Sequence, residues 1–266
     1  MALTGSGIHH EVSTGSGATV VFLHGVTLDS RMWSAQLAAF GDRWRCVTVD
    51  LRGHGLSAPL EPGYDPTSDL LQVLDENGLD RCILVGLSLG GHDAVVFAAL
   101  HPARCRALVL VDAWIPGPEL AGWEPPWRVA REAGRQAGLD AWLADPLFAT
   151  TYRRRRLRED LLKMVTANDL RIWTESISRA PHPSIRELAG QIHAPTQVLV
   201  GEEDLPGFRA AAAWLAANIP GAAARPAVLV PEAGHLPPME APEAFNRELS
   251  AFVDSLPERG ARARLR

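Results

Sequence analysis

The chain has 266 residues, a length that suits one large domain or a domain that carries an inserted one. Hydrophobic residues make up 47% and charged residues 21%, the composition of an ordinary globular protein. The formal net charge of −5 gives no reason to expect a nucleic-acid partner. No uninterrupted apolar run is long enough to predict a membrane span. Residues 1–17 lack the basic-then-apolar pattern of a signal peptide, so we expect a cytoplasmic protein.

The cysteines indicate the redox environment. Cys46, Cys82 and Cys105 all lie in or beside predicted strands. An odd number of cysteines without a recognisable spacing predicts buried free thiols rather than a disulfide framework or a zinc site. We therefore expect no metal. The expected partner is a small-molecule substrate, and the expected assembly is a monomer or a homodimer.

Strand-like runs alternate with helical runs along the chain. The strand-like runs are continuously apolar, as in a parallel sheet that is covered on both faces. They are Thr19–Leu23, Cys46–Asp50, Cys82–Gly86, Ala107–Val111, Thr196–Val200 and Ala227–Val230. The helical runs between and after them are Asp29–Phe40, Pro66–Asn77, His92–Leu100, Phe208–Asn218 and Pro242–Ser255. This alternation predicts an α/β sheet with right-handed crossovers.

The interval from Trp114 to Gly190 interrupts this alternation, because it contains helical runs and no strand pattern. The runs are Pro126–Ala137, Leu139–Leu147, Arg153–Val165 and Asn168–Arg179. We interpret the interval as a helical cap over the carboxyl edge of the sheet, where α/β folds bind ligands. The predicted organisation is a core in two parts, 1–113 and 191–266, with a cap at 114–190. The run Arg153–Arg156 is interpreted as a solvated helix face.

A Gly-x-Ser-x-Gly motif, Gly86 to Gly90, joins the third predicted strand to the following helix. In that setting the motif is typical of a nucleophile elbow, a strained turn that lifts the serine hydroxyl into a pocket. Glycines flank the serine because strand and helix leave no room for Cβ atoms. The helix N-terminus also favours developing negative charge. Ser88 is therefore the candidate nucleophile.

A serine hydroxyl needs a base, most often a histidine, whose pKa lies near neutral pH. His235 follows the last predicted strand directly, so its loop opens at the same sheet edge as the elbow. His92 is too close to Ser88 in sequence to turn back toward it. The candidate base is therefore His235.

The acid that orients this histidine is expected at the end of another strand. The turn after Thr196–Val200 contains Glu202, Glu203 and Asp204. Asp204 is the predicted acid, although chemistry alone does not decide among the three. Asp112, at the end of Ala107–Val111, is the alternative.

An oxyanion hole needs two N–H donors aimed at the developing charge. Leu89, the residue after the nucleophile, supplies one, and Val26, in the His24-Gly25-Val26 turn after the first strand, supplies the other. His24 is interpreted as bracing this turn.

Substrate pockets are mostly apolar and aromatic. The candidate pocket residues are Trp33, Trp114, Trp142 and Leu236. Five of the eight tryptophans lie in the cap, where they either line the pocket or pack the helices.

With these residues identified, nearly the whole chain resembles the α/β-hydrolase superfamily. The order Ser88, Asp204, His235 is that of this superfamily and differs from the orders of the two common serine-protease folds. The segment Asp50–Ser57 is similar to the superfamily's D-x-R-G-x-G-x-S loop, so Arg52 and His54 are interpreted as architectural. The elbow and the Gly201–Asp204 turn are similar to those of 3-oxoadipate enol-lactonases and related small carboxylesterases.

This resemblance implies a capped α/β-hydrolase fold and a cofactor-free serine hydrolase that cleaves a small, largely apolar ester or lactone through an acyl-enzyme. The alternatives within enzymes are a carbon–carbon bond hydrolase and a perhydrolase that use the same triad. The alternative from another class is a ligand receptor or stress sensor with little turnover.

The chain departs from the family pattern in two places. Residues 7–15 leave room for one edge strand in place of a hairpin, and the segment from Gly63 to Asp80 is compact.

Overall fold

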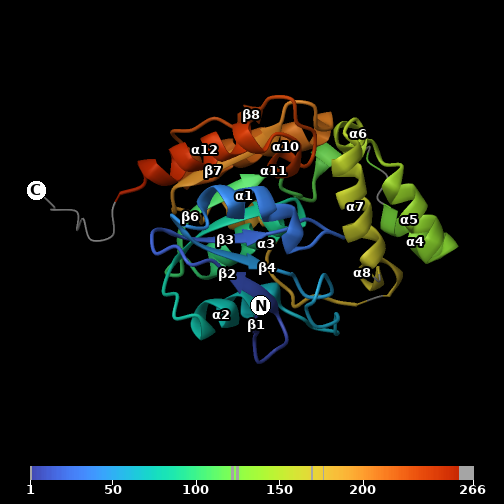
Figure 1. The fold of residues 1–266 in the computed structure, drawn as a ribbon, viewed down its shortest axis with the longest axis horizontal. Helices are drawn as coiled ribbons and strands as arrows, with labels where there is room; N and C mark the ends of the chain where they lie inside the picture. Colours follow the sequence, from blue (N-terminus) through green and yellow to red (C-terminus); the bar gives the residue numbers. More distant parts are fainter. Residues whose placement is uncertain (1, 121–122, 124–125, 169, 176, 258–266) are drawn as a thin grey trace, which may run out of the picture.

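A computed structural model of the protein describes residues 2–120, 123, 126–168, 170–175 and 177–257. Within these ranges one sheet of eight strands runs through the molecule in the order β1-β2-β4-β3-β5-β6-β7-β8 (Figure 1). The pairs from β4 to β8 are parallel, whereas β1 and β2 are antiparallel to their neighbours. The strands are β1 (Ala2–Leu3), β2 (His9–Val12), β3 (Thr19–Leu23), β4 (Arg45–Val49), β5 (Cys82–Leu87), β6 (Cys105–Val111), β7 (Thr196–Gly201) and β8 (Val228–Val230). The α/β-hydrolase architecture expected from the sequence is therefore present.

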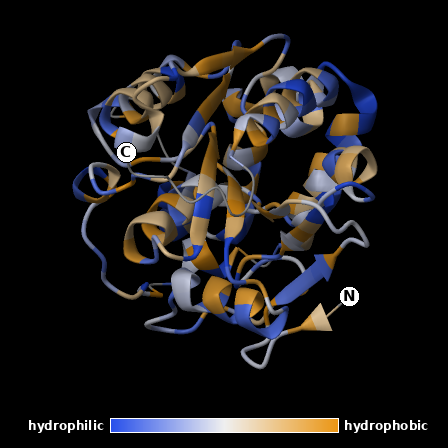
Figure 2. Ribbon diagram, turned by 90° about the vertical axis from the view of Figure 1, so that its left-hand side faces the viewer, coloured by the Kyte–Doolittle hydropathy of each residue, from blue (hydrophilic) through white to orange (hydrophobic). Residues whose placement is uncertain are grey.

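Helices cover both faces of the sheet, as the continuous apolar strands require. Val20 and Phe22 of β3 point into the cluster that contains α1 (Ser34–Phe40) and α12 (Pro242–Ser255). Val21 and Leu23 point into the opposite cluster, which contains α2 (Pro66–Glu76), α3 (Leu89–Leu100) and α10 (Pro206–Asn218). Figure 2 shows the apolar strands enclosed between these layers. In the described ranges, no helix combines the length and apolarity that crossing a membrane requires.

Between β6 and β7 the described residues form helices, as predicted. They are α4 (Pro126–Ala133), α5 (Arg135–Leu143), α6 (Ala149–Tyr152), α7 (Arg155–Ala167), α8 (Arg171–Thr174) and α9 (Ile185–Ala189). Helices α4 to α8 stand together beside one edge of the core (Figure 1), whereas α9 contacts α3. Three of the predicted runs have other bounds than expected. The run predicted over Pro126–Ala137 stops at Ala133, because Gly134 separates α4 from α5. The run predicted over Leu139–Leu147 begins earlier and stops at Leu143, before Asp145 caps a separate turn at Pro146, and the run predicted over Asn168–Arg179 is helical at Arg171–Thr174.

The N-terminal segment corrects one expectation from the sequence. It forms an antiparallel hairpin of β1 and β2 instead of a single edge strand. The residues of β2 that are buried are histidines, and each places a ring nitrogen against a polar partner, whereas His9 Nε2 is buried without a hydrogen bond to any described residue. His9 Nδ1 lies 2.9 Å from Asp50 Oδ2, and His10 Nε2 lies 2.9 Å from Asn77 Nδ2. The apolar pattern that predicts strands is therefore missing here.

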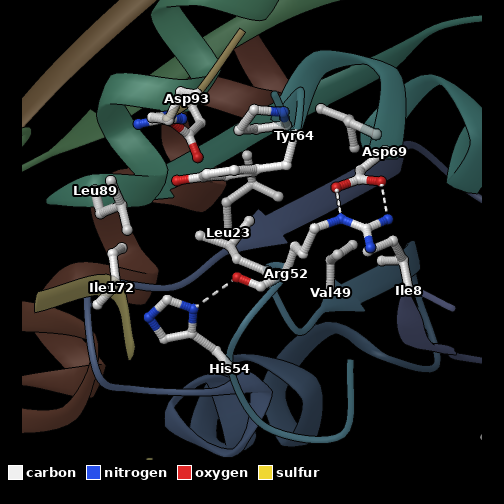
Figure 3. A pocket seen from close by; sticks show the side chains of 14 residues that line it. Ile8, Leu23, Val49, Arg52, His54, Tyr64, Asp69, Leu89, Asp93 and Ile172 are labelled. Atoms are coloured by element: carbon white, nitrogen blue, oxygen red, sulfur yellow. Dashed lines mark hydrogen bonds and ion pairs between the residues drawn. The ribbon is translucent and has the colours of Figure 1, made fainter. Parts of the chain in front are cut away.

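The loop after β4 is architectural, as predicted. Asp50 accepts hydrogen bonds from the backbone N–H groups of Ser30 and Leu56, and the Ser57 hydroxyl donates to the Asp50 carbonyl. Arg52 forms a two-point ion pair with Asp69 (Figure 3). His54 is buried, with its Nδ1 3.1 Å from the Arg52 carbonyl and no hydrogen-bond partner for Nε2 among the described residues.

The three cysteines are free and buried, as predicted. Burial raises the pKa of Cys46 to about 11 and that of Cys105 to about 12. Burial likewise raises the pKa of Cys82 well above its ordinary value. The thiolate is the reactive form, so these protonated thiols are structural residues.

Gly90 provides a test of how closely β3 and α3 approach each other. A Cβ atom at this position would lie 2.3 Å from the Leu23 carbonyl oxygen and 2.6 Å from that of His24, and backbone atoms cannot move away cheaply. Gly90→Ala is expected to lower the free energy of unfolding by about 2 kcal/mol or more, measured by urea denaturation. Gly190→Ala is the control, because a Cβ there meets nothing within 4 Å. A Gly90→Ala protein as stable as the control would contradict this close packing.

The buried ring of His54 should make the free energy of unfolding depend on pH. Burial lowers the pKa of His54 from 6.5 to about 3, so the folded protein holds this ring neutral in acid while the unfolded chain protonates it. Stability is then lost as the pH falls from about 6.5 toward 3, at up to about 1.4 kcal/mol per pH unit from this group. In urea titrations between pH 7 and pH 4.5, His54→Gln is expected to show a smaller loss than the wild type. An unchanged slope would show that His54 is not held neutral.

Candidate active site

Ser88 lies between β5 and α3 with an unusual backbone conformation, φ 51° and ψ −111°. Non-glycine residues rarely adopt positive φ, and such strain is found disproportionately at functional sites. Hydrogen bonds hold this backbone conformation in place. The Ser88 N–H donates to the Val111 carbonyl, and the Ser88 carbonyl accepts from the Trp114 N–H. A Cβ on Gly86 would lie 2.3 Å from the Gly90 carbonyl oxygen, so the glycines are needed where strand and helix meet. This geometry is that of a nucleophile elbow.

The turn after β3 lies directly against this elbow. A Cβ on Gly25 would be 3.5 Å from the Ser88 Cβ, and the Gly90 N–H donates to the His24 carbonyl at 3.1 Å. His24 braces the turn, as predicted: its Nδ1 lies 2.7 Å from the Gly25 carbonyl, and its Nε2 accepts from the Leu51 N–H. Burial lowers the pKa of His24, which favours the neutral ring that this pattern requires.

His235 and Asp204 are in direct contact. His235 Nδ1 lies 2.9 Å from Asp204 Oδ2, and both side chains are buried. The other Asp204 oxygen accepts from the Leu205 N–H at 2.7 Å. Of the three consecutive acids considered from the sequence, Asp204 is the one that meets the histidine, whereas Glu202 and Glu203 are exposed and Glu203 pairs with Arg153.

Asp112, the alternative acid, belongs to the same buried group. Its side chain accepts from the Gly201 N–H at 2.9 Å. One polar atom each of Asp112, Asp204 and His235 lie within 4.8 Å of one another. That spacing would also suit a metal ion, but the direct bond between His235 and Asp204 already satisfies those two groups. Burial, and then the neighbouring Asp204 carboxylate, raise the pKa of Asp112 well above its ordinary value, so the protonated form of Asp112 is favoured.

Glu240 was not identified from the sequence, although it holds the histidine loop in place. It is fully buried, and one of its oxygens accepts from the N–H groups of Gly234 and Leu236, the two neighbours of His235. Its other oxygen accepts from the hydroxyl of Thr151 on α6. In the sequence, Glu240 is visible only as an acid five residues after the candidate base His235. That spacing does not reveal that the Glu240 side chain is buried and points inward.

A cavity of about 270 Å³ opens onto Ser88. Val26 and Leu89, whose N–H groups were predicted to form the oxyanion hole, line the same cavity. Leu89 is the first residue of α3, so its N–H has no acceptor within the helix. The remaining wall is mainly aromatic: Tyr64, Trp114, Trp123, Trp127, Trp142, Trp173 and Phe208. The ring of Phe208 lies 4.4 Å from that of His235, which places the histidine behind this wall.

The structure separates the four predicted pocket residues into two groups. Trp114 and Trp142 line the cavity. Trp33 and Leu236 are not among its lining residues. Trp33 is fully buried in the core with its ring 5.0 Å from that of Phe22, because its short helical turn packs against the sheet rather than facing the cavity.

The inserted helices contact the turn after β3 through Trp142. Its indole N–H donates to the Thr27 hydroxyl at 2.8 Å, and the Thr27 hydroxyl donates to the Val26 carbonyl. Thr27 has a positive φ of 63°, so the backbone beside Val26 is held in an uncommon conformation. Trp142 therefore both lines the cavity and fixes the segment predicted to bind the oxyanion.

Comparison with known proteins identifies the family. The α/β hydrolase family model matches residues 20–248. The chain is 27% identical to the pimeloyl-[acyl-carrier protein] methyl ester esterase of Nitrosomonas europaea, over 89% of this chain and 96% of that protein. The esterase RhEst1 from Rhodococcus sp. ECU1013 superposes with a TM-score of 0.80 at 27% identity, over 96% and 98% of the two chains. The enol-lactonase from Burkholderia xenovorans LB400 gives a TM-score of 0.73 at 26% identity, over 96% and 99%. The chain belongs to the α/β hydrolase family.

Proposed function

We propose that this protein is a serine hydrolase that cleaves carboxylic esters or lactones, with Ser88 as nucleophile, His235 as general base and Asp204 as the orienting acid. The observation that carries the proposal is the strained Ser88 turn, which opens on the same cavity as Val26 and Leu89. The bonded pair of His235 and Asp204 supports it from the neighbouring strand ends. The esterase and enol-lactonase relatives support the same reaction class.

In the proposed mechanism, the bond between His235 Nδ1 and Asp204 leaves Nε2 to take the proton of the Ser88 hydroxyl. The serine oxygen attacks the ester carbonyl, and the N–H groups of Val26 and Leu89 stabilise the oxyanion. His235 then protonates the leaving alcohol and activates water, which releases the acid from the enzyme. Each oxyanion donor contributes about 3 kcal/mol to lowering the barrier.

The inserted helices, residues 114–190, act in this proposal as a cap that selects the substrate. They supply Trp114, Trp123, Trp127, Trp142 and Trp173 to the cavity wall. Such a wall favours a flat, apolar acyl or alcohol group, which stacks on the rings and leaves water on binding.

The central test is loss of activity in Ser88→Ala. The wild type is expected to hydrolyse p-nitrophenyl acetate and butyrate, and Ser88→Ala to lose at least about 10⁴-fold in kcat with its fold unchanged. Ser68→Ala, which removes an exposed hydroxyl on α2, is the control and is expected to keep full activity. A fluorophosphonate should label Ser88 stoichiometrically by mass spectrometry. Turnover that survives Ser88→Ala, or ligand binding without measurable turnover in the wild type, would reject the proposal.

The two buried acids are expected to differ in their response to amidation. Asp204→Asn removes the negative charge that orients His235 and should lower kcat by about 10²- to 10⁴-fold. Asp112→Asn should cost less than about 10-fold, because an amide resembles the protonated carboxyl group that burial favours at this position. Steady-state kinetics of both variants at pH 7 to 9 test the assignment. A larger loss in Asp112→Asn than in Asp204→Asn would make Asp112 the orienting acid.

A further inference from the structure

The wall of the cavity at Ser88 contains two guanidinium groups among its aromatic side chains. Arg131 and Arg179 are the charged residues among the described side chains that line it. No carboxylate lines the cavity in the described part of the chain. Two guanidinium groups without a carboxylate among the described lining residues favour a substrate that carries an anionic group.

Arg179 lines the cavity at the elbow and has contacts with Tyr64 and Asp93. Its backbone bridges to Tyr64, and its guanidinium lies 5.6 Å from the centre of the Tyr64 ring. One Nη donates to Asp93, which lies on α3 one helical turn after Leu89. The Arg179 cation, against the effect of burial, lowers the pKa of Asp93 to about 2, so this pair is charged at neutral pH.

Arg179 keeps donors for a further partner. Nη2 is the atom that donates to Asp93, whereas Nη1 has no hydrogen bond to any described residue, and Nε is buried without one. The side chain is 24% exposed. A guanidinium that is fixed by one carboxylate and still presents free N–H groups is preorganised to bind a second one.

Arg179 belongs to a wall that separates the cavity at Ser88 from a second cavity. Figure 3 shows a smaller, neighbouring cavity in which Leu89 and Ile172 lie together near Asp93 and the Tyr64 ring, away from Ile8 and Asp69. Arg179, Leu89, Ile172 and Tyr64 line both cavities, so they form the wall between them. The smaller cavity, about 20 Å³, holds roughly one water molecule, so a substrate group that meets Arg179 lies in the larger cavity.

Arg131 adds a second positive charge on the solvent side. It is exposed, its Nε donates to the Trp173 carbonyl at 3.3 Å, and no described carboxylate forms an ion pair with it. Asp93 offsets one of the two arginines, which leaves one net positive charge. A single carboxylate would neutralise it, whereas a phosphate dianion would not be balanced.

We propose that Arg179 is a specificity residue that binds a carboxylate of the substrate, so that preferred substrates are esters or lactones carrying a free carboxylate a few bonds from the scissile carbonyl. This inference rests on the proposed serine hydrolase function. The aromatic wall holds the carbon chain or ring between the two ends, and Arg179 fixes its orientation relative to Ser88. Fixing one end of the substrate positions the carbonyl for attack.

The test compares monomethyl glutarate with methyl pentanoate, which has a methyl group in place of the carboxylate. The wild type is expected to show at least about 10-fold higher kcat/KM for the glutarate ester, measured by acid release in a pH-stat. Arg179→Gln should lower kcat/KM for this ester by about 10- to 100-fold and leave methyl pentanoate within about 3-fold. Arg179→Lys should lie between them, because it keeps the charge without the planar fork. Arg131→Gln, the matched control, should have the smaller effect.

Arg179→Gln leaves Asp93 buried without its cation and can fail to fold. The double variant Asp93→Asn with Arg179→Gln removes both charges, and it should show the same loss of preference with wild-type circular dichroism.

Glutarate should inhibit p-nitrophenyl acetate hydrolysis by the wild type competitively and at lower concentration than inorganic phosphate does. Equal loss on both esters in the variants, or a wild-type preference for methyl pentanoate, would overturn the inference while leaving a Ser88-dependent esterase. Stronger inhibition by phosphate would overturn the choice of a carboxylate, and absence of Ser88-dependent turnover of any ester would reject the proposed function itself.

Discussion

The strained backbone of Ser88 is the constraint on which the candidate site depends. A positive φ at a serine costs about 1–3 kcal/mol, and it persists only where the surroundings leave no alternative. Here α3 approaches β5 so closely that Gly86 cannot carry a side chain, and it approaches the end of β3 so closely that Gly90 cannot either. The neighbouring strand β6 accepts the Ser88 N–H through Val111. The sheet therefore maintains the serine conformation, and the stability of the core sustains the geometry of the site.

The inserted helices are connected to both halves of the site by buried hydrogen bonds. Trp142 donates to Thr27 beside the predicted oxyanion turn, and Thr151 donates to Glu240 beneath the histidine loop. Buried hydrogen bonds of this kind are strong locally and costly to leave unmade. A shift of the insertion would therefore disturb the oxyanion turn and the histidine loop together, so the segment that shapes the cavity also stabilises the machinery beneath it.

The sequence predicted the parts of this arrangement that topology determines. Parallel strands bring their carboxyl ends to one edge, so the Gly-x-Ser-x-Gly motif and the strand-end positions could single out Ser88 and His235 as candidates. For the acid, Asp204 was preferred, and Glu202, Glu203 and Asp112 stayed open until the structure showed which of them contacts His235. Burial and direction could not be predicted in the same way. Glu240 is an ordinary acid in the sequence, and its role arises from three hydrogen bonds made by residues from separate segments. Trp33 was a plausible pocket residue until packing against Phe22 placed it in the core.

Buried ionisable groups lie on both sides of Ser88, and they differ in their charge state. Near His235, the carboxyl groups of Asp112 and Asp204 are buried close to each other, and ionising both would place like charges together in a medium of low dielectric constant. Burial and the neighbouring Asp204 carboxylate favour the protonated form of Asp112, which avoids this repulsion beside the histidine that takes the proton in the proposed mechanism. Beyond Leu89 the ion pair of Asp93 and Arg179 remains charged because each partner stabilises the other. In the proposed mechanism Asp204 lies beside the histidine that transfers the proton, and in the proposed substrate complex Arg179 binds the carboxylate, so the elbow lies between these two groups.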